Sequence, residues 1–146
     1  MRKHWKLALS LLATLLWLCF IYARSAQPAS VSHAESSAFL APLSKLFPFL
    51  TMRIVRKLAH FVEYAALGSL LWLDWRLLGR GRWFLPLAAG LVFAAADELL
   101  QTRIPGRSGE LKDVLLDFSG VCAAFCAAAL LNRMIRRRKE RKRCEA

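Results

Sequence analysis

Apolar residues along this chain are gathered into four long runs. The runs cover Trp5–Ala23, Ile54–Leu73, Trp83–Leu100 and Val114–Leu131. Each is close to the roughly 20 residues that an α-helix needs to cross a hydrocarbon core of about 30 Å. Segments inside a membrane must satisfy their own backbone polar groups, and runs of this length do so as helices. The pattern predicts an all-α polytopic membrane protein, a four-helix transmembrane bundle forming a single domain over residues 1–146.

The composition supports this class and explains the excess of positive charge. Hydrophobic residues make up 57% of the chain, and the mean hydropathy is +0.36, which is too apolar for an ordinary soluble domain. The formal net charge is +12, but eight of the 22 Lys and Arg lie between Arg133 and Arg143, directly after the last run. Such a juxtamembrane cluster attracts anionic lipid by about 1 kcal/mol per residue. With no nucleic-acid module recognisable, the tail 132–146 predicts membrane lipids, and no nucleic acid, as partners.

The basic residues between the runs also predict how the chain is inserted. When the runs alternate in direction, one side of the membrane collects fourteen Lys and Arg and the other side eight. The richer side holds both termini and is therefore expected to be cytoplasmic, with segments 24–53 and 101–113 outside. The apolar second half of segment 24–53 is too short to span and is expected at the outer interface. The short, Gly-rich loop around Asp74–Arg82 predicts a tight turn on the cytoplasmic side.

The first run has an alternative interpretation as a cleaved signal peptide. Met1–Lys6 is basic, an apolar run follows, and Ala23-Arg24-Ser25 resembles a cleavage site. The run is long for a signal peptide, so a retained helix is the favoured interpretation. Either outcome leaves the rest of the topology unchanged.

The few ionisable residues of the runs fall at ends that meet at one level of the bilayer. Because the spans alternate in direction, the start of the second, the end of the third and the start of the fourth lie side by side. Charges in a membrane helix are costly, so their convergence predicts a functional site. The candidate residues are Arg56, His60, Glu63, Asp97, Glu98, Gln101, Arg107, Asp113 and Asp117.

Helix periodicity places these polar residues on the same faces as small residues. At about 100° per residue, Gly90 and Ala94 share a face with Asp97, and Asp117 shares a face with Gly120. Small residues allow membrane helices to approach closely. We therefore expect the charged ends to point into the bundle and to form a polar pocket near the outer leaflet.

The residues leave several uses of this pocket open. Five basic and six acidic residues nearly balance in it, which suits a self-neutralising network that holds the helices together. Polar contacts between membrane helices average only about 0.6 kcal/mol, however, which favours a binding or chemical role for so many charges. A histidine beside carboxylates also suits acid–base catalysis, so the sequence does not decide whether the protein is an enzyme.

A metal site is a further alternative. It would use His60, Glu63 and one or two of the carboxylates Asp97, Glu98 and Asp117. One imidazole with carboxylates suits several divalent ions, so this donor set is not specific. The prediction from sequence is therefore no metal and no cofactor.

Four motifs in this order resemble those of the VanZ family. They are Arg56–Tyr64 (RKLAHFVEY), Asp97–Gln101 (DELLQ), Pro105–Arg107 (PGR) and Asp117–Gly120 (DFSG), with Asp113 preceding the last. The resemblance implies a multi-pass protein of the bacterial cytoplasmic membrane. It also implies a possible link to glycopeptide resistance, because the name-giving member is associated with reduced sensitivity to teicoplanin. The polar positions of the family map onto the same nine candidate residues.

These observations lead to one favoured function and two alternatives. The favoured function is binding of an anionic, lipid-linked or peptidoglycan-precursor ligand, with Arg56 and Arg107 donating forked hydrogen bonds to phosphate or carboxylate. The first alternative is a membrane enzyme acting on a lipid-linked phosphate or ester, with His60 and a carboxylate as acid and base. The second is a structural or assembly partner.

Overall fold

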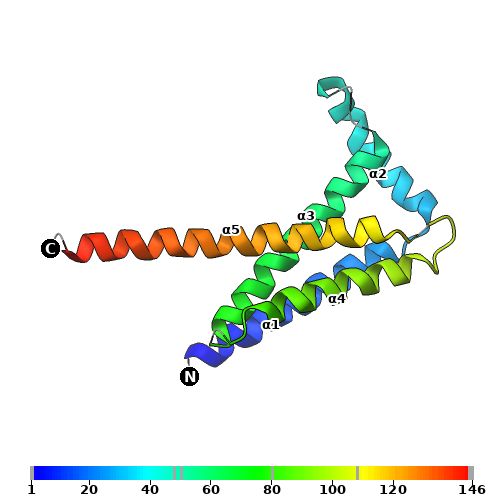
Figure 1. Ribbon diagram of the computed structural model, residues 1–146. Helices are drawn as coiled ribbons and strands as arrows, with labels where there is room; N and C mark the ends of the chain where they lie inside the picture. The colour runs from blue at the N-terminus through cyan, green and yellow to red at the C-terminus, as the bar shows by residue number, and fades with distance from the viewer. Residues whose placement is uncertain (1, 48, 50, 80, 108, 145–146) are drawn as a thin grey trace.

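The computed structural model describes residues 2–47, 49, 51–79, 81–107 and 109–144. Every helix or strand assigned in these residues is an α-helix, which confirms the all-α prediction. The helices are α1 (Arg2–Ser25), α2 (Ala29–Leu46), α3 (Met52–Leu77), α4 (Phe84–Gln101) and α5 (Leu111–Cys144). Figure 1 shows α1 and α4 running side by side, with α3 and α5 crossing each other beside them.

Three helices are long and apolar enough to cross a membrane. They contain the segments His4–Ser25, Phe84–Gln101 and Leu111–Arg143, and they include three of the four predicted runs. Helix α3 has 26 residues but carries His60, Glu63 and Asp74 among its apolar residues. These polar residues lower its mean hydropathy, so membrane insertion of the second predicted span, and with it the four-helix transmembrane bundle, stays a prediction.

Helix α2 was not predicted from the sequence. It occupies Ala29–Leu46, inside the segment expected at the outer interface, and it contacts α3. The chain turns into it directly after α1, where the backbone N–H groups of Val31 and Ser32 both donate to the carbonyl oxygen of Pro28. The described part of the chain therefore contains five helices, and segment 24–53 contributes one of them, α2, which contacts α3.

Helix α3 is the centre of the architecture, because it contacts each of the other four helices. Its crossing with α5 is close enough to exclude side chains. A Cβ atom added to Gly68 would lie 2.5 Å from the carbonyl oxygen of Val121, and one added to Gly120 would lie 2.5 Å from that of Phe61. On α4, a Cβ added to Gly90 would meet Val121 at 2.7 Å. The stripes of small residues thus do lie at close helix contacts, as predicted.

A buried polar contact joins α1 to the far end of α3. The carboxylate of Asp74 accepts hydrogen bonds from the hydroxyl groups of Ser10 and Thr14, the latter at 2.7 Å. The sequence pattern predicts Asp74 in the loop after the second run. The structure corrects this, because α3 continues to Leu77 and the turn follows, with Gly79 at a φ of 105°. The sequence signal for this contact is the pair Ser10 and Thr14, two hydroxyl side chains one turn apart on an otherwise apolar run, which can donate hydrogen bonds to a buried carboxylate.

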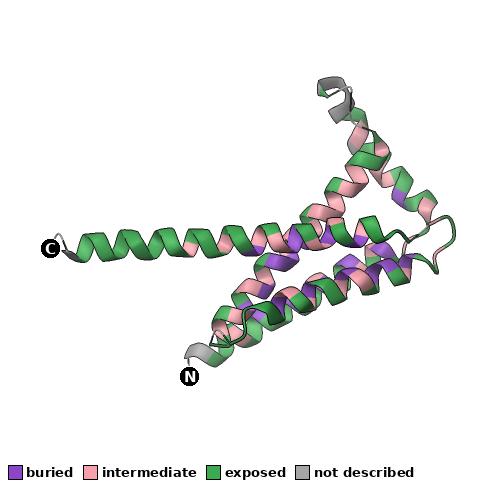
Figure 2. Ribbon diagram, viewed as in Figure 1, coloured by how far each residue is buried: buried purple, intermediate pink, exposed green. Residues whose placement is uncertain are grey.

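Much of the outer surface is apolar, as expected of helices in contact with lipid. Leu16 on α1, Val92 on α4 and Leu130 on α5 are each more than 60% exposed. Beyond them α5 extends away from the other helices, and every residue from Arg133 to Arg143 is exposed (Figure 2). The basic tail is thus the continuation of one long helix.

The close crossing of α3 and α5 predicts that Gly120→Ala destabilises the protein. The added methyl group meets backbone atoms of Phe61 that cannot move independently, and overpacking of this kind costs about 1–3 kcal/mol. The measurement is the midpoint of thermal unfolding of the purified protein in detergent. Gly81→Ala is the control, because a Cβ atom there meets nothing within 4 Å. Equal midpoints for the two variants would contradict the close crossing.

Candidate functional site

A polar cavity of about 250 Å³, here called the site pocket, lies where α3 begins, α4 ends and α5 begins. Seven of the nine candidate residues line it. Of the other two, Asp97 lies directly behind its wall and Glu63 lies away from it. The lining residues are Arg53, Arg56, Lys57, His60, Glu98, Gln101, Gly106, Arg107, Glu110, Asp113, Leu116 and Asp117. The structure therefore brings together side chains that are more than 60 residues apart in the chain.

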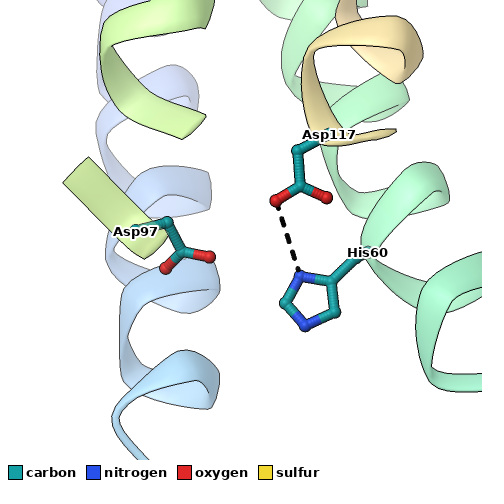
Figure 3. A group of neighbouring side chains, drawn as sticks. All are labelled: His60, Asp97 and Asp117. Carbon is teal, nitrogen blue, oxygen red and sulfur yellow. Dashed lines mark ion pairs between the residues drawn. The ribbon is translucent and has the colours of Figure 1, made fainter. Parts of the chain in front are cut away.

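One side chain from each of three helices meets at the inner wall of the pocket. His60 comes from α3, Asp97 from α4 and Asp117 from α5 (Figure 3). A nitrogen of His60 and an oxygen of each carboxylate all lie within 4.8 Å of one another. Nδ1 of His60 is 3.8 Å from Oδ2 of Asp117. We call these three residues the three-residue cluster.

Asp97 is held in place by two neutral donors. Its Oδ2 accepts hydrogen bonds from the hydroxyl of Ser25, at 2.9 Å, and from the side-chain amide of Gln101, at 3.2 Å. Ser25 is the last residue of α1 and was not among the candidate residues. The run pattern ended the first span at Ala23, so no signal in the sequence pointed to this contact. A carboxylate with one oxygen fixed has its other oxygen oriented as well.

Two other acidic residues serve to close the pocket. Oε1 of Glu98 accepts the backbone N–H of Glu110 at 2.6 Å, which ties the loop after α4 back to its helix. Asp113, in the first turn of α5, forms an ion pair with Lys57 of α3 at 2.5 Å. These contacts give part of the charged set a structural role.

Glu63 is separated from the pocket by a partner that the sequence analysis missed. Its Oε1 lies 3.1 Å from Nε of Arg24, and the same guanidinium lies 3.0 Å from Glu35 of α2. In the sequence, Arg24 is only one of the basic residues that predict the orientation in the membrane. It joins α1, α2 and α3 at the level of the pocket, so Glu63 is neutralised by this ion pair.

The arginines of the pocket have no such partners. Within the part of the chain that the structure describes, Arg53, Arg56 and Arg107 form no ion pair. Burial, reinforced by repulsion from Arg56, lowers the pKa of the Arg107 guanidinium from its ordinary value. Asp97 and Glu98 attract Arg107 through space, but no described carboxylate forms an ion pair with Arg56 or Arg107, so the two guanidinium groups remain suited to an anion.

A second cavity of about 510 Å³, here called the apolar groove, adjoins the site pocket. It shares three lining residues with the pocket, namely Arg56, His60 and Arg107. Its apolar wall is formed by side chains of α1 and α3: Trp17, Phe20, Val55, Leu58, Ala59 and Val62. A charged pocket that adjoins an apolar groove is complementary to an amphiphile, a molecule with an anionic group and a hydrocarbon chain.

Comparison with known proteins identified a family model that matches most of the chain. The family model described as VanZ/LLP1 matches residues 10–132, a range that includes every lining residue of the site pocket and of the apolar groove but not the basic end of α5. No curated protein and no solved structure matches the chain.

Proposed function

The chain belongs to the VanZ/LLP1 family, as its motifs predicted, and we propose that it binds an anionic, lipid-linked ligand of the bacterial envelope. The charged group of the ligand would occupy the site pocket and its hydrocarbon chain the apolar groove. One observation carries this proposal: arginines without carboxylate partners lie where the pocket and the groove share residues.

The size and charge of the pocket favour a phosphate or carboxylate group. A volume of about 250 Å³ holds a head group rather than a complete drug-sized ligand, for which pockets of about 300–1,000 Å³ are usual. Arg56 and Arg107 can each donate two parallel hydrogen bonds to such a group. An anion between them also relieves their mutual repulsion, which gives binding an additional electrostatic gain.

The groove favours a ligand that arrives through the membrane. Leu58 and Val62 line it and are 52% and 62% exposed, so its apolar wall is open to the surroundings of the helices. A hydrocarbon chain can move from the lipid into this groove without crossing water. The hydrocarbon chain of the ligand would thus set its depth in the membrane, and the charged group would determine which lipids bind.

The charge distribution supports the location that we propose. The exposed basic end of α5 would bind anionic lipid at the cytoplasmic face, so that both termini lie inside and the pocket faces the outer leaflet. Glycopeptides act on the peptide stem of the peptidoglycan precursor outside the cytoplasmic membrane. We therefore propose a lipid-linked precursor as the ligand and reduced sensitivity to teicoplanin as the phenotype.

A membrane enzyme acting on a lipid-linked phosphate or ester is the second candidate. It is supported by His60, which lines the pocket with Asp117 as its neighbour at 3.8 Å. This pair could transfer a proton at the ligand's charged group. Release of phosphate or of an acyl group from the bound lipid by the purified protein would favour this candidate over binding alone.

Binding of a polyisoprenyl monophosphate to the purified protein tests the proposal. Arg56→Gln and Arg107→Gln are each expected to weaken binding by at least about tenfold, the effect of losing one charge-assisted contact. Arg103→Gln is the matched control, because Arg103 lies in the same loop as Arg107 but is exposed and outside the pocket. The corresponding unphosphorylated alcohol should bind weakly. Equal binding of the alcohol and the phosphate, or no loss in Arg56→Gln, would contradict the proposal.

In cells, expression of the wild-type protein is expected to reduce teicoplanin susceptibility, and His60→Ala or Asp97→Asn is expected to abolish that effect. The comparison requires equal amounts of each protein in the membrane, measured by immunoblot. If the variants lose protection only as far as their abundance falls, the structural alternative is correct. If the wild type gives no protection, the resistance phenotype is wrong, and the lipid-binding result stands by itself.

A further inference from the structure

Two carboxylates of the three-residue cluster are buried and form no ion pair with any described Lys or Arg side chain. Asp97 is 0% exposed and Asp117 is 1% exposed. The ion pairs that Lys and Arg form in the described residues involve Glu35, Glu63 and Asp113 instead. Oδ1 of Asp97 and Oδ1 of Asp117 also have no hydrogen-bond partner there. A carboxylate is costly to bury without a charged partner, so two whose oxygens lie within 4.8 Å of each other require an explanation.

His60 completes a set of donor atoms around one point. Its Nδ1 has no hydrogen-bond partner in the described chain, and its distance of 3.8 Å to Asp117 is too long for a hydrogen bond. Figure 3 shows the three side chains pointing from three different helices toward the same space. Their nearest donor atoms lie within 4.8 Å of one another. Ligands of a tetrahedral ion with bonds of about 2.1 Å lie about 3.4 Å apart, so small side-chain rotations would close the set on an ion.

We propose that His60, Asp97 and Asp117 bind one divalent transition-metal ion, such as Zn²⁺ or Mn²⁺. A dication would neutralise both carboxylates and use the unpaired imidazole nitrogen, which removes the three unsatisfied groups together. An imidazole with two carboxylates suits Zn²⁺ and Mn²⁺ better than Ca²⁺, which prefers six or more oxygen ligands. The hydrogen bonds from Ser25 and Gln101 orient Asp97 as the outer shell of a metal site does.

The structure also reduces the set of ligands that the sequence allowed. Glu63 is bound by Arg24, and Glu98 accepts the backbone N–H of Glu110, so both are engaged elsewhere. His60 and Asp117 line the site pocket, so the remaining coordination positions of the ion face that cavity. Water or an oxygen of an anionic ligand could bind there. The ion itself is independent of the proposed lipid ligand, and its binding is measured without lipid.

The test is the metal content of the full-length protein, purified in detergent through a tag that contains no histidine. The protein is stripped with EDTA, incubated with Zn²⁺ or Mn²⁺, desalted and analysed by mass spectrometry of the elements. The wild type is expected to retain about one ion per chain, as a three-ligand site does, and His60→Ala and Asp117→Asn at most one tenth of that. Glu110→Gln is the matched control, because Glu110 is an exposed acidic residue of the same pocket outside the cluster.

Thermal unfolding provides a second measurement that separates loss of the ion from loss of the fold. Adding the metal should raise the unfolding midpoint of the wild type and of Glu110→Gln, but not that of His60→Ala. Ser25→Ala, which leaves all three ligands in place, should bind the ion about 10–100-fold more weakly. The proposal is overturned if the wild type retains no more metal than His60→Ala, or if Glu110→Gln loses as much. The carboxylates would then be neutralised by protons.

Discussion

The close crossing of α3 and α5 is the contact on which the rest of the site depends. Gly120 packs against the backbone of Phe61, so the two helices meet without intervening side chains. His60 directly precedes Phe61, and Asp117 lies one helical turn before Gly120. The crossing therefore places the imidazole beside the carboxylate. Helix α4 joins the same contact through Gly90, which packs against Val121, and two turns later on the same face it presents Asp97.

The pairing of the charges distinguishes a binding site from a network that only holds helices together. Where a charge has a structural role, it is paired: Lys57 with Asp113, and Arg24 with Glu63. The remaining groups line or adjoin one cavity, and in the described residues neither Arg56 nor Arg107 forms an ion pair with Asp97 or Asp117. Arg56 and Arg107 lie on the side shared with the apolar groove, and the aspartates lie at the inner wall. A self-neutralising network would have joined these opposite charges, whereas a site leaves them free for a ligand.

Much of this arrangement could be predicted from sequence periodicity. Helices that alternate in direction bring the polar ends of α3, α4 and α5 to the same depth, and this requires no knowledge of side-chain contacts. The positions of His60, Asp97 and Asp117 relative to the small residues follow from about 100° per residue. Contacts that depend on which helices are neighbours could not be predicted this way. Glu63 lies one turn from His60 on the same face of α3, but its side chain pairs with Arg24. This is because α1 and α2 pack beside α3 at that position.

Contacts at both ends of α1 also could not be predicted from periodicity. Ser25 contributes to the site only because the end of α1 lies beside α4, and Asp74 is buried only because Ser10 and Thr14 face it. Helix α2 escaped prediction because its sequence is mixed in polarity and contains Pro42. In each case the local pattern was weak, and tertiary contacts determined the outcome.

Arg56 and Arg107 are proposed to serve a ligand rather than the fold, and the thermal stability of the double variant Arg56→Gln/Arg107→Gln tests this role. The measurement is its midpoint of thermal unfolding without added lipid, compared with that of the wild type. The double variant is predicted to unfold at about the same midpoint, because it loses no described ion pair and because relief of the repulsion between the guanidinium groups offsets the lost attraction of Arg107 to Asp97 and Glu98. A midpoint lower by more than about 3 °C corresponds to roughly 1 kcal/mol for a chain of this size. Such a loss would show that the two arginines hold the helices together and would contradict their role in ligand binding.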